Sequence, residues 1–184
     1  MLERGERAIA PRRIASAVLV PVFRDERGEL RVLLVQRGMH GVHAGQLGFP
    51  GGKREPTDRS LLETALRETE EEVGLARDRI EILTSLDPLD TRATGYRVHP
   101  YLARIVPPPR WRLAEGEIAG ILTPTLQALT DPRARQDREL SFADWPKGIR
   151  VACVLLDDGR LLWGLTLRLL DSLLPRLLAG EWAI

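Results

Sequence analysis

A pair of glycines followed by a glutamate-rich segment constrains this chain most. Gly51 and Gly52 stand in a short stretch between two prolines, and residues 60–73 follow after a polar turn. At about 100° per residue, residues 60–73 carry an apolar stripe suited to packing on a core. The stripe consists of Leu62, Leu66, Thr69 and Val73. Ser60, with a glutamate three residues later, suits an N-cap, and Gly74 suits a left-handed C-cap. We therefore predict a helix over residues 60–73.

Three carboxylates fall together on another side of this predicted helix. Glu68, Glu71 and Glu72 stand at positions i, i+3 and i+4, so they are surface neighbours that repel one another. Arg67, four residues before Glu71, is placed to neutralise one of them, which leaves Glu68 and Glu72 to share a cation. Because the available ligands are all oxygens, Mg²⁺ or Mn²⁺ is the expected ion. The glycine pair lets a backbone carbonyl approach that ion closely, and Gly52 is the expected donor.

The glycine pair and the predicted helix together resemble the Nudix box, whose second half reads R-E-U-x-E-E-x-G-U with U aliphatic. Residues 67–75 match this half closely. Asp58 stands at the first acidic position of the box, where the general pattern has glutamate. Eight residues separate Asp58 from Arg67, one more than in the general pattern. Both departures are similar to those of the coenzyme A diphosphatase branch of the Nudix hydrolases.

The segment upstream of the box also resembles that branch. Residues 33–37 and 43–52 are similar to the signature of the branch, which runs directly into the box. Gly41 or Val42 stands where the branch usually carries an arginine. The resemblance extends over roughly residues 12–175.

The resemblance implies an α/β fold of the Nudix type, with a mixed β-sheet sandwiched between α-helices. It implies metal-dependent hydrolysis of a nucleoside diphosphate linked to another moiety, above all coenzyme A, which yields 3′,5′-ADP and 4′-phosphopantetheine. Mg²⁺ or Mn²⁺ held by Glu68, Glu72 and Glu71 would neutralise phosphate oxygens and lower the pKa of a bound water. Glu68, Glu71 and Glu117 are the candidate bases for that water, and Arg67 would orient a carboxylate.

Basic side chains near the glycine pair predict contacts with the substrate. The forked guanidinium groups of Arg13 and Arg37 suit bidentate binding of phosphates, and Arg37 also falls on the signature of the branch. His43 borders a glycine-containing loop that is placed to fold over the site. The alternative interpretation is surface charge for the two arginines and loop packing for His43.

Two other functions stay open. The first is a Nudix diphosphatase for ADP-ribose or dinucleotides, which the replaced arginine of the signature leaves possible. The second is a non-catalytic domain that binds a nucleotide. Loss of a helix carboxylate would be the sequence signature of such a domain, whereas Glu68, Glu71 and Glu72 are all present. A panel of substrates separates the three functions.

Composition bounds the domain organisation and the partners. With 184 residues, of which 43% are hydrophobic, the chain fits an N-terminal arm over residues 1–13 and a single domain over residues 14–184. A net charge of +1 argues against nucleic acid as the main partner. The charged N-terminus and the lack of a long apolar run predict a cytoplasmic protein without membrane contact. Cys153 is expected in the core, and the leucine-rich residues 164–178 are expected to cover the sheet or to meet a second subunit in a homodimer.

Periodicity and turn residues predict the other elements. We expect strands at residues 14–23, 30–36, 80–86, 96–106 and 118–122, a hairpin at 149–156 and 160–163, and helices at 124–129 and 164–178. Pro175 is expected to kink or end the last helix. Residues 130–144 are expected to form a charged loop.

Overall fold

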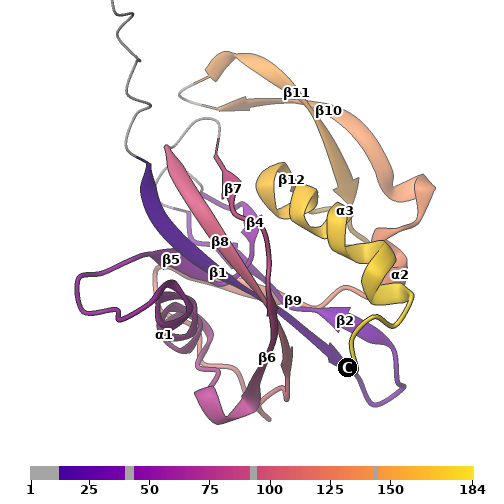
Figure 1. The fold of residues 1–184 in the computed structure, drawn as a ribbon. Helices are drawn as coiled ribbons and strands as arrows, with labels where there is room; N and C mark the ends of the chain where they lie inside the picture. Colours follow the sequence, from indigo (N-terminus) through magenta and orange to yellow (C-terminus); the bar gives the residue numbers. More distant parts are fainter. Residues whose placement is uncertain (1–12, 40–43, 92–94, 143–144) are drawn as a thin grey trace, which may run out of the picture.

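A mixed β-sheet forms the centre of the molecule in the computed structural model, which describes residues 13–39, 44–91, 95–142 and 145–184 (Figure 1). The sheet contains β1 (Ile14–Arg24), β2 (Leu30–Val32), β5 (Gly51–Lys53), β6 (Ile80–Ser85), β7 (Leu89–Asp90) and β8 (Tyr96–Ile105). Its main order is β2-β1-β8-β6; β5 pairs with β1, and β7 pairs with β8. The long strands β1 and β8 run parallel, and the other pairs are antiparallel. The predicted arm, apart from its last residue, lies outside the described residues.

Two smaller antiparallel sheets accompany the central one. The first has the order β4-β3-β9, and the second has the order β10-β11-β12. Their strands are β3 (Leu34–Arg37), β4 (Leu47–Gly48), β9 (Ile118–Leu122), β10 (Arg135–Phe142), β11 (Trp145–Leu155) and β12 (Leu161–Trp163). The strand predicted over residues 30–36 is therefore two strands. The chain leaves β1 after Val32 and pairs with β9 from Leu34 onward, so one apolar run serves two sheets.

The loop predicted over residues 130–144 is wrong for its second half, which is β10. Four residues of β10 are charged, and most of its described side chains are exposed. The strand forms because β11 supplies a ladder of backbone partners, from Arg135 opposite Val154 to Phe142 opposite Trp145. Pairing of this kind overrides the local composition, since strand preference depends strongly on neighbouring strands.

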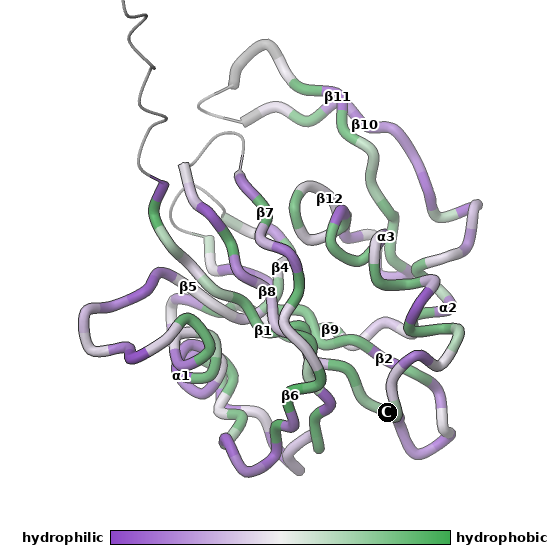
Figure 2. Tube along the Cα trace, viewed as in Figure 1, coloured by the Kyte–Doolittle hydropathy of each residue, from purple (hydrophilic) through white to green (hydrophobic). Residues whose placement is uncertain are grey.

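Three α-helices lie on the two sides of the strands: α1 (Leu61–Val73), α2 (Leu126–Leu129) and α3 (Gly164–Leu178); short 3₁₀ turns stand at Arg77–Arg79 and Pro132–Ala134. Alternate residues of β1 feed two hydrophobic clusters. Val20 and Val22 face the cluster that includes α2 and α3, and Leu19 and Phe23 face the cluster that includes the end of α1. Figure 2 shows hydrophobic segments along β1 and α3 and hydrophilic ones in the outer turns. The mixed sheets and three helices of the described residues confirm the predicted α/β class.

The leucine-rich helix α3 covers the core. Its buried side chains are Thr166, Leu167, Leu169, Leu170, Leu173, Leu174 and Leu177. The predicted helix over residues 164–178 is confirmed, and Pro175 does not end it but lies inside its last turn. Among the described residues, no helix is long and apolar enough to cross a membrane. Cys153 is buried, as predicted.

The helix α1 has the predicted ends but a different buried face. The Ser60 hydroxyl accepts a hydrogen bond from the Glu63 N–H, and Gly74 closes the helix with φ 69°. The buried residues are Thr64, Ala65, Thr69, Glu72 and Val73, whereas Leu62 and Leu66 are only half-buried. Small side chains and the adjacent glycines of β5 let the helix lie close to the sheet. As a result Glu72, which we had expected on a separate acidic side, lies on the packed side.

Candidate active site at the glycine pair and helix α1

Both glycines of β5 have close neighbours on either side of the strand, with backbone atoms against Gly51 and a side-chain carboxylate against Gly52. At Gly51 φ is 148°, and an added Cβ would lie 2.3 Å from the carbonyl oxygen of Ala17. At Gly52 an added Cβ would lie 2.4 Å from the carboxyl carbon of Glu68. The β5 backbone therefore fits between β1 on one side and the acidic helix on the other, and it brings the Glu68 carboxylate against the strand.

Arg67 is the centre of an ion-pair network that includes a residue outside the helix. Its Nε lies 2.9 Å from Asp58 Oδ1, its Nη1 lies 2.9 Å from Glu71 Oε2, and its Nη2 lies 3.1 Å from Glu68 Oε1. Asp58 is buried and also accepts hydrogen bonds from the Thr64 hydroxyl and the Glu55 N–H. The Arg67 guanidinium holds the pKa of Asp58 well below its usual range. Asp58 thus fixes Arg67, and Arg67 fixes two helix carboxylates.

Glu72 is a buried carboxylate whose negative charge is only partly balanced by neighbouring donors and cations. Only 5% of the residue is exposed, and its Oε2 accepts a 3.0 Å hydrogen bond from the Gly51 N–H. Burial raises the pKa of Glu72 to about 7, the Arg37 charge and the Gly51 N–H oppose that rise, and the charges of Glu68 and Glu117 add to it. A second cation beside Glu72 would remove much of this electrostatic cost.

Glu68 and Glu72 suit a hard divalent cation. Burial also raises the pKa of Glu68, although Arg67 lowers it in part, so two partly desolvated carboxylates repel each other here. Within the described part of the chain, no three His, Cys, Asp or Glu side chains gather closely enough to form a protein-only metal site. Two carboxylates completed by substrate phosphates and water are the usual environment of Mg²⁺.

The structure brings most of the predicted catalytic residues together, with differences in detail. Glu71 is more than half exposed, and its Oε2 is engaged by Arg67 Nη1 at 2.9 Å; its role as a metal ligand stays a prediction. Glu117 is exposed, and its charge acts on Glu72. Gly52 pairs with Ala17 in the β-ladder, whereas the Gly51 carbonyl is the one that lies 3.4 Å from Arg37 Nη2. Gly52 as metal donor stays a prediction.

The three predicted substrate-binding residues differ in their positions relative to the glycine pair. Arg37 lies beside the glycine pair, because its Nη2 is 3.4 Å from the Gly51 carbonyl oxygen. Arg13 forms an ion pair of 3.1 Å with Asp90 and donates to the carbonyl of Thr91, so its guanidinium is engaged at the start of β1. His43 lies outside the described residues. Contact of these three side chains with substrate stays a prediction.

Two features of the site were missed at the sequence level. One is the positioning role of Asp58, which its place in the box pattern could have indicated. The other is the segment before β9, which closes the end of α1: the Ala114 N–H donates to the Glu72 carbonyl, and the Gly38 N–H donates to the Glu117 carbonyl. No local sequence signal marks these contacts, because they join segments far apart in the chain.

We expect Gly52→Ala to fold normally and to lose about 10²-fold in activity. The backbone of Gly52 is not in the left-handed region, but the new methyl group would displace the Glu68 carboxylate, and misplacement by about 1 Å has effects of this size. Steady-state hydrolysis and thermal unfolding would be measured. Gly48→Ala is the matched control, because its Cβ would only reach ordinary contact with Thr166. A folded Gly52→Ala protein with full activity would contradict the placement of Glu68.

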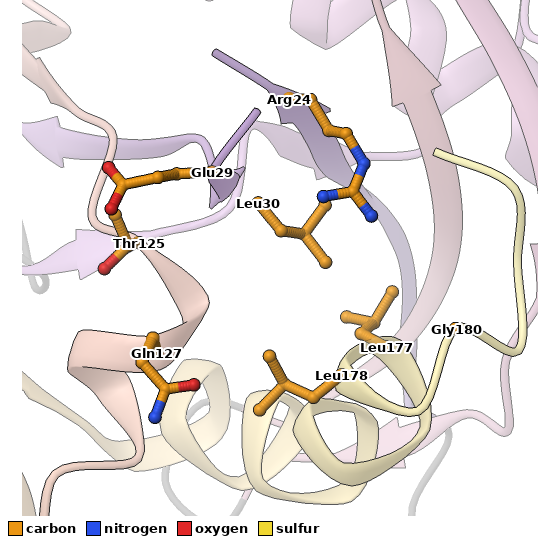
Figure 3. A pocket seen from close by; sticks show the side chains of 8 residues that line it. All are labelled: Arg24, Glu29, Leu30, Thr125, Gln127, Leu177, Leu178 and Gly180. Atoms are coloured by element: carbon orange, nitrogen blue, oxygen red, sulfur yellow. The ribbon is translucent and has the colours of Figure 1, made fainter. Parts of the chain in front are cut away.

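A separate pocket of about 250 Å³ lies at the opposite end of β1 (Figure 3). Its lining residues are Arg24, Glu29, Leu30, Thr125, Gln127, Leu177, Leu178 and Gly180. Arg24 already donates to the carbonyls of Gly28 and Ile184. The pocket contains none of the residues of the acidic site, so the candidate active site rests on the glycine pair and α1.

The site consists of an acidic helix that an arginine holds against a glycine pair. Comparison with known families shows which class of protein this chain belongs to. A model of the NUDIX domain matches residues 13–145, and the chain belongs to the Nudix family. Proteins described as the uncharacterized Nudix hydrolase NudL, from Salmonella paratyphi B and Salmonella newport, are each 42% identical over 116 residues. The match covers 62% of this chain and 59% of each relative.

Solved structures support the fold. A MutT/nudix family protein from Enterococcus faecalis has a TM-score of 0.59 at 19% identity, covering 94% of this chain and 65% of that chain. The NUDIX domain of Shewanella oneidensis NrtR, solved with ADP ribose, has a TM-score of 0.56 at 19% identity, covering 90% of this chain and 89% of that chain. At this identity the likeness concerns the fold alone, and it confirms the predicted Nudix fold.

Proposed function

We propose that this protein hydrolyses a nucleoside diphosphate linked to another moiety, with Mg²⁺ or Mn²⁺, and that coenzyme A is the preferred substrate. The observation that carries the hydrolase proposal is the pair of half-buried Glu68 and buried Glu72 against the glycine pair, with the neighbouring Arg37 as the positive charge beside it. The choice of coenzyme A rests on the resemblance of residues 33–37 and 43–52 to the signature of that branch.

We assign a different role to each group of residues in the site. Glu68 and Glu72 would hold the divalent cation, which neutralises phosphate oxygens and lowers the pKa of water when it is bound. Arg37 donates toward the same place and suits binding of the diphosphate. Asp58 and Arg67 keep Glu68 oriented before substrate arrives, which is the preorganisation that stabilises a charged transition state.

We propose Glu117 as the carboxylate that accepts the proton of the attacking water. Glu71 is committed to Arg67, and Glu68 faces the proposed cation. Glu117 is exposed, acts electrostatically on Glu72, and has no ion-pair partner among the described residues. Its backbone is held at that position by the bond from Gly38 to its carbonyl. Proton acceptance by this side chain therefore needs no rearrangement of the network around Arg67.

A substrate panel tests the proposed function. Purified protein with Mg²⁺ or Mn²⁺ would be given coenzyme A, ADP-ribose, NADH and diadenosine polyphosphates, and products would be resolved by chromatography. Release of 3′,5′-ADP from coenzyme A with the highest kcat/KM is the expected result. Preference for another substrate would keep the diphosphatase and reject coenzyme A. Absence of turnover on all of them would favour a domain that binds nucleotides without cleaving them.

A further inference from the structure

The ladder between β3 and β9 ends at a close backbone contact between Gly38 and Glu117. The Gly38 N–H donates to the Glu117 carbonyl at 2.6 Å. A Cβ added to Gly38 would lie 2.3 Å from the carbonyl oxygen of Gly116 and 3.2 Å from that of Glu117. The φ of Gly38 is outside the left-handed region, so the backbone conformation does not require glycine. Because the close neighbours are backbone atoms, a side chain at Gly38 would force the turn before β9 to move.

A register shift in the same ladder brings Gly38 and Glu117 beside each other. Arg37 pairs with Ile118 after this shift, and Ala119 is an extra residue of β9 at that point. An extra residue on one strand is a β-bulge, which bends the strand and redirects its side chains. The residue that follows Arg37 on one strand therefore meets the residue that precedes Ile118 on the other.

Gly38 also belongs to a closed circuit of contacts around the acidic site. On one side, its neighbour Arg37 lies 3.4 Å from the Gly51 carbonyl, and the Gly51 N–H donates to the Glu72 carboxylate. On the other side, the turn before Glu117 donates a backbone N–H to the Glu72 carbonyl at 3.0 Å. The contact between Gly38 and Glu117 joins the two sides. The position of Glu117 relative to Glu72 therefore depends on this contact.

The turn before β9 has room to move if a side chain is placed at Gly38. At Gly116 φ is 81°, and an added Cβ would have no atom of the described residues within 4 Å. Glu117 is exposed, whereas Ile118 is buried in a core cluster. A methyl group on Gly38 would therefore shift residues 116–117 and leave β9 in place. Ordinary contact begins at 3.4 Å, so a shift of about 1 Å is expected.

We propose that Gly38 is a positioning residue for the reaction, because its missing side chain lets the Glu117 carboxylate reach the attacking water. This inference rests on the proposed function, in which Glu117 accepts the proton of that water. The charge of Glu117 already acts on Glu72, so the two carboxylates are near each other. Gly38 touches no reacting atom and acts only through Glu117.

A double-mutant cycle tests whether Gly38 acts through Glu117. With the best substrate of the panel, Gly38→Ala is expected to lower kcat by about tenfold to a hundredfold and to leave KM within about twofold. In a Glu117→Gln background the proton acceptor is already lost, so the same substitution is expected to change kcat by less than about twofold. Gly120→Ala is the matched control, because Gly120 lies in the same ladder and its added Cβ would reach only ordinary contact distances.

A second variant moves the same turn without a clash at Gly38. In Gly116→Ala the left-handed φ of 81° disfavours a side chain, so the peptide between residues 116 and 117 is expected to rotate. This variant should also lower kcat, and its effect should also disappear in the Glu117→Gln background. Circular dichroism would verify that each variant is folded, and Gly116→Ala decides the question if Gly38→Ala does not fold.

A crystal structure of Gly38→Ala gives a result that does not depend on activity, and Glu117 is expected to be displaced by about 1 Å relative to Glu72. Full kcat in the folded variant, an equal loss in both backgrounds, or a loss confined to KM would overturn the role of Gly38. A Glu117→Gln protein with the wild-type kcat would also overturn it, while the hydrolase stands. If the wild type cleaves no substrate of the panel, the proposed function falls, and the crystal structure decides whether Gly38 sets the position of Glu117.

Discussion

Glu72→Gln is expected to lower activity by about 10²- to 10³-fold while it stabilises the metal-free protein. Glutamine keeps an acceptor for the Gly51 N–H but removes the charge that a divalent cation would need. In EDTA at pH 8 the free energy of unfolding is expected to rise by up to about 3 kcal/mol, which corresponds to the rise of the Glu72 pKa from 4.5 to about 7.

The sign of this effect follows from proton linkage. A carboxyl group with a raised pKa binds its proton more tightly in the folded state, so ionisation favours unfolding. In metal-free wild type, the contribution of Glu72 is complete below pH 4.5 and is lost as pH rises to about 7. Glu72→Gln has no ionising carboxyl group at this position, so its free energy of unfolding does not show this fall. Urea unfolding between pH 4.5 and pH 8 would therefore show the two proteins diverging as pH rises.

Excess Mg²⁺ should reverse the order of stability. Cation binding stabilises only a protein that can hold the ion, so the wild type gains more than Glu72→Gln. Glu70→Gln is the matched control, because Glu70 lies exposed on the same helix and pairs with Arg77 only at 3.7 Å. A folded Glu72→Gln protein with the wild-type rate, or one that is less stable than wild type in EDTA at pH 8, would contradict the role of Glu72.

Asp58→Asn is expected to destabilise the protein by about 3 kcal/mol or more and to lower activity by about tenfold to a hundredfold. The side chain of Asp58 is 4% exposed and that of Arg67 is 18% exposed, so the substitution leaves a poorly solvated guanidinium without its main partner. Arg67 then moves toward Glu68 and Glu71. The measured quantities are urea unfolding at pH 7 and steady-state hydrolysis.

Acid should reduce the difference between wild type and Asp58→Asn. The pKa of Asp58 is lowered in the folded protein, so its stabilising contribution is present above about pH 4 and is lost as pH falls. Asp137→Asn tests an exposed ion pair, with Arg150, and is expected to change stability by less than about 1 kcal/mol. Equal, small effects of Asp58→Asn and Asp137→Asn would show that the Arg67 network does not organise the site.

Sequence reasoning was most successful where the signal is local. The ends of α1 follow from Ser60 and Gly74, whose capping depends on neighbours within one turn. The strands of residues 14–23 and 96–106 lie within one residue of β1 and β8. In contrast, the strand at Arg135–Phe142 was missed, because its charged side chains carry no pattern and only pairing with β11 makes it a strand.

The sequence by itself determined the α/β class and the acidic helix behind a glycine pair, because spacing and capping act between near neighbours in the chain. The metal chemistry of Glu68 and Glu72 stays a proposal from the same spacing. Only the tertiary structure decided that Glu72 is buried, that Asp58 holds Arg67, and that Gly38 meets Glu117. The physical reason is that burial and ion pairing depend on which distant segments approach each other. That approach is set by the packing of all three sheets and the helices around them.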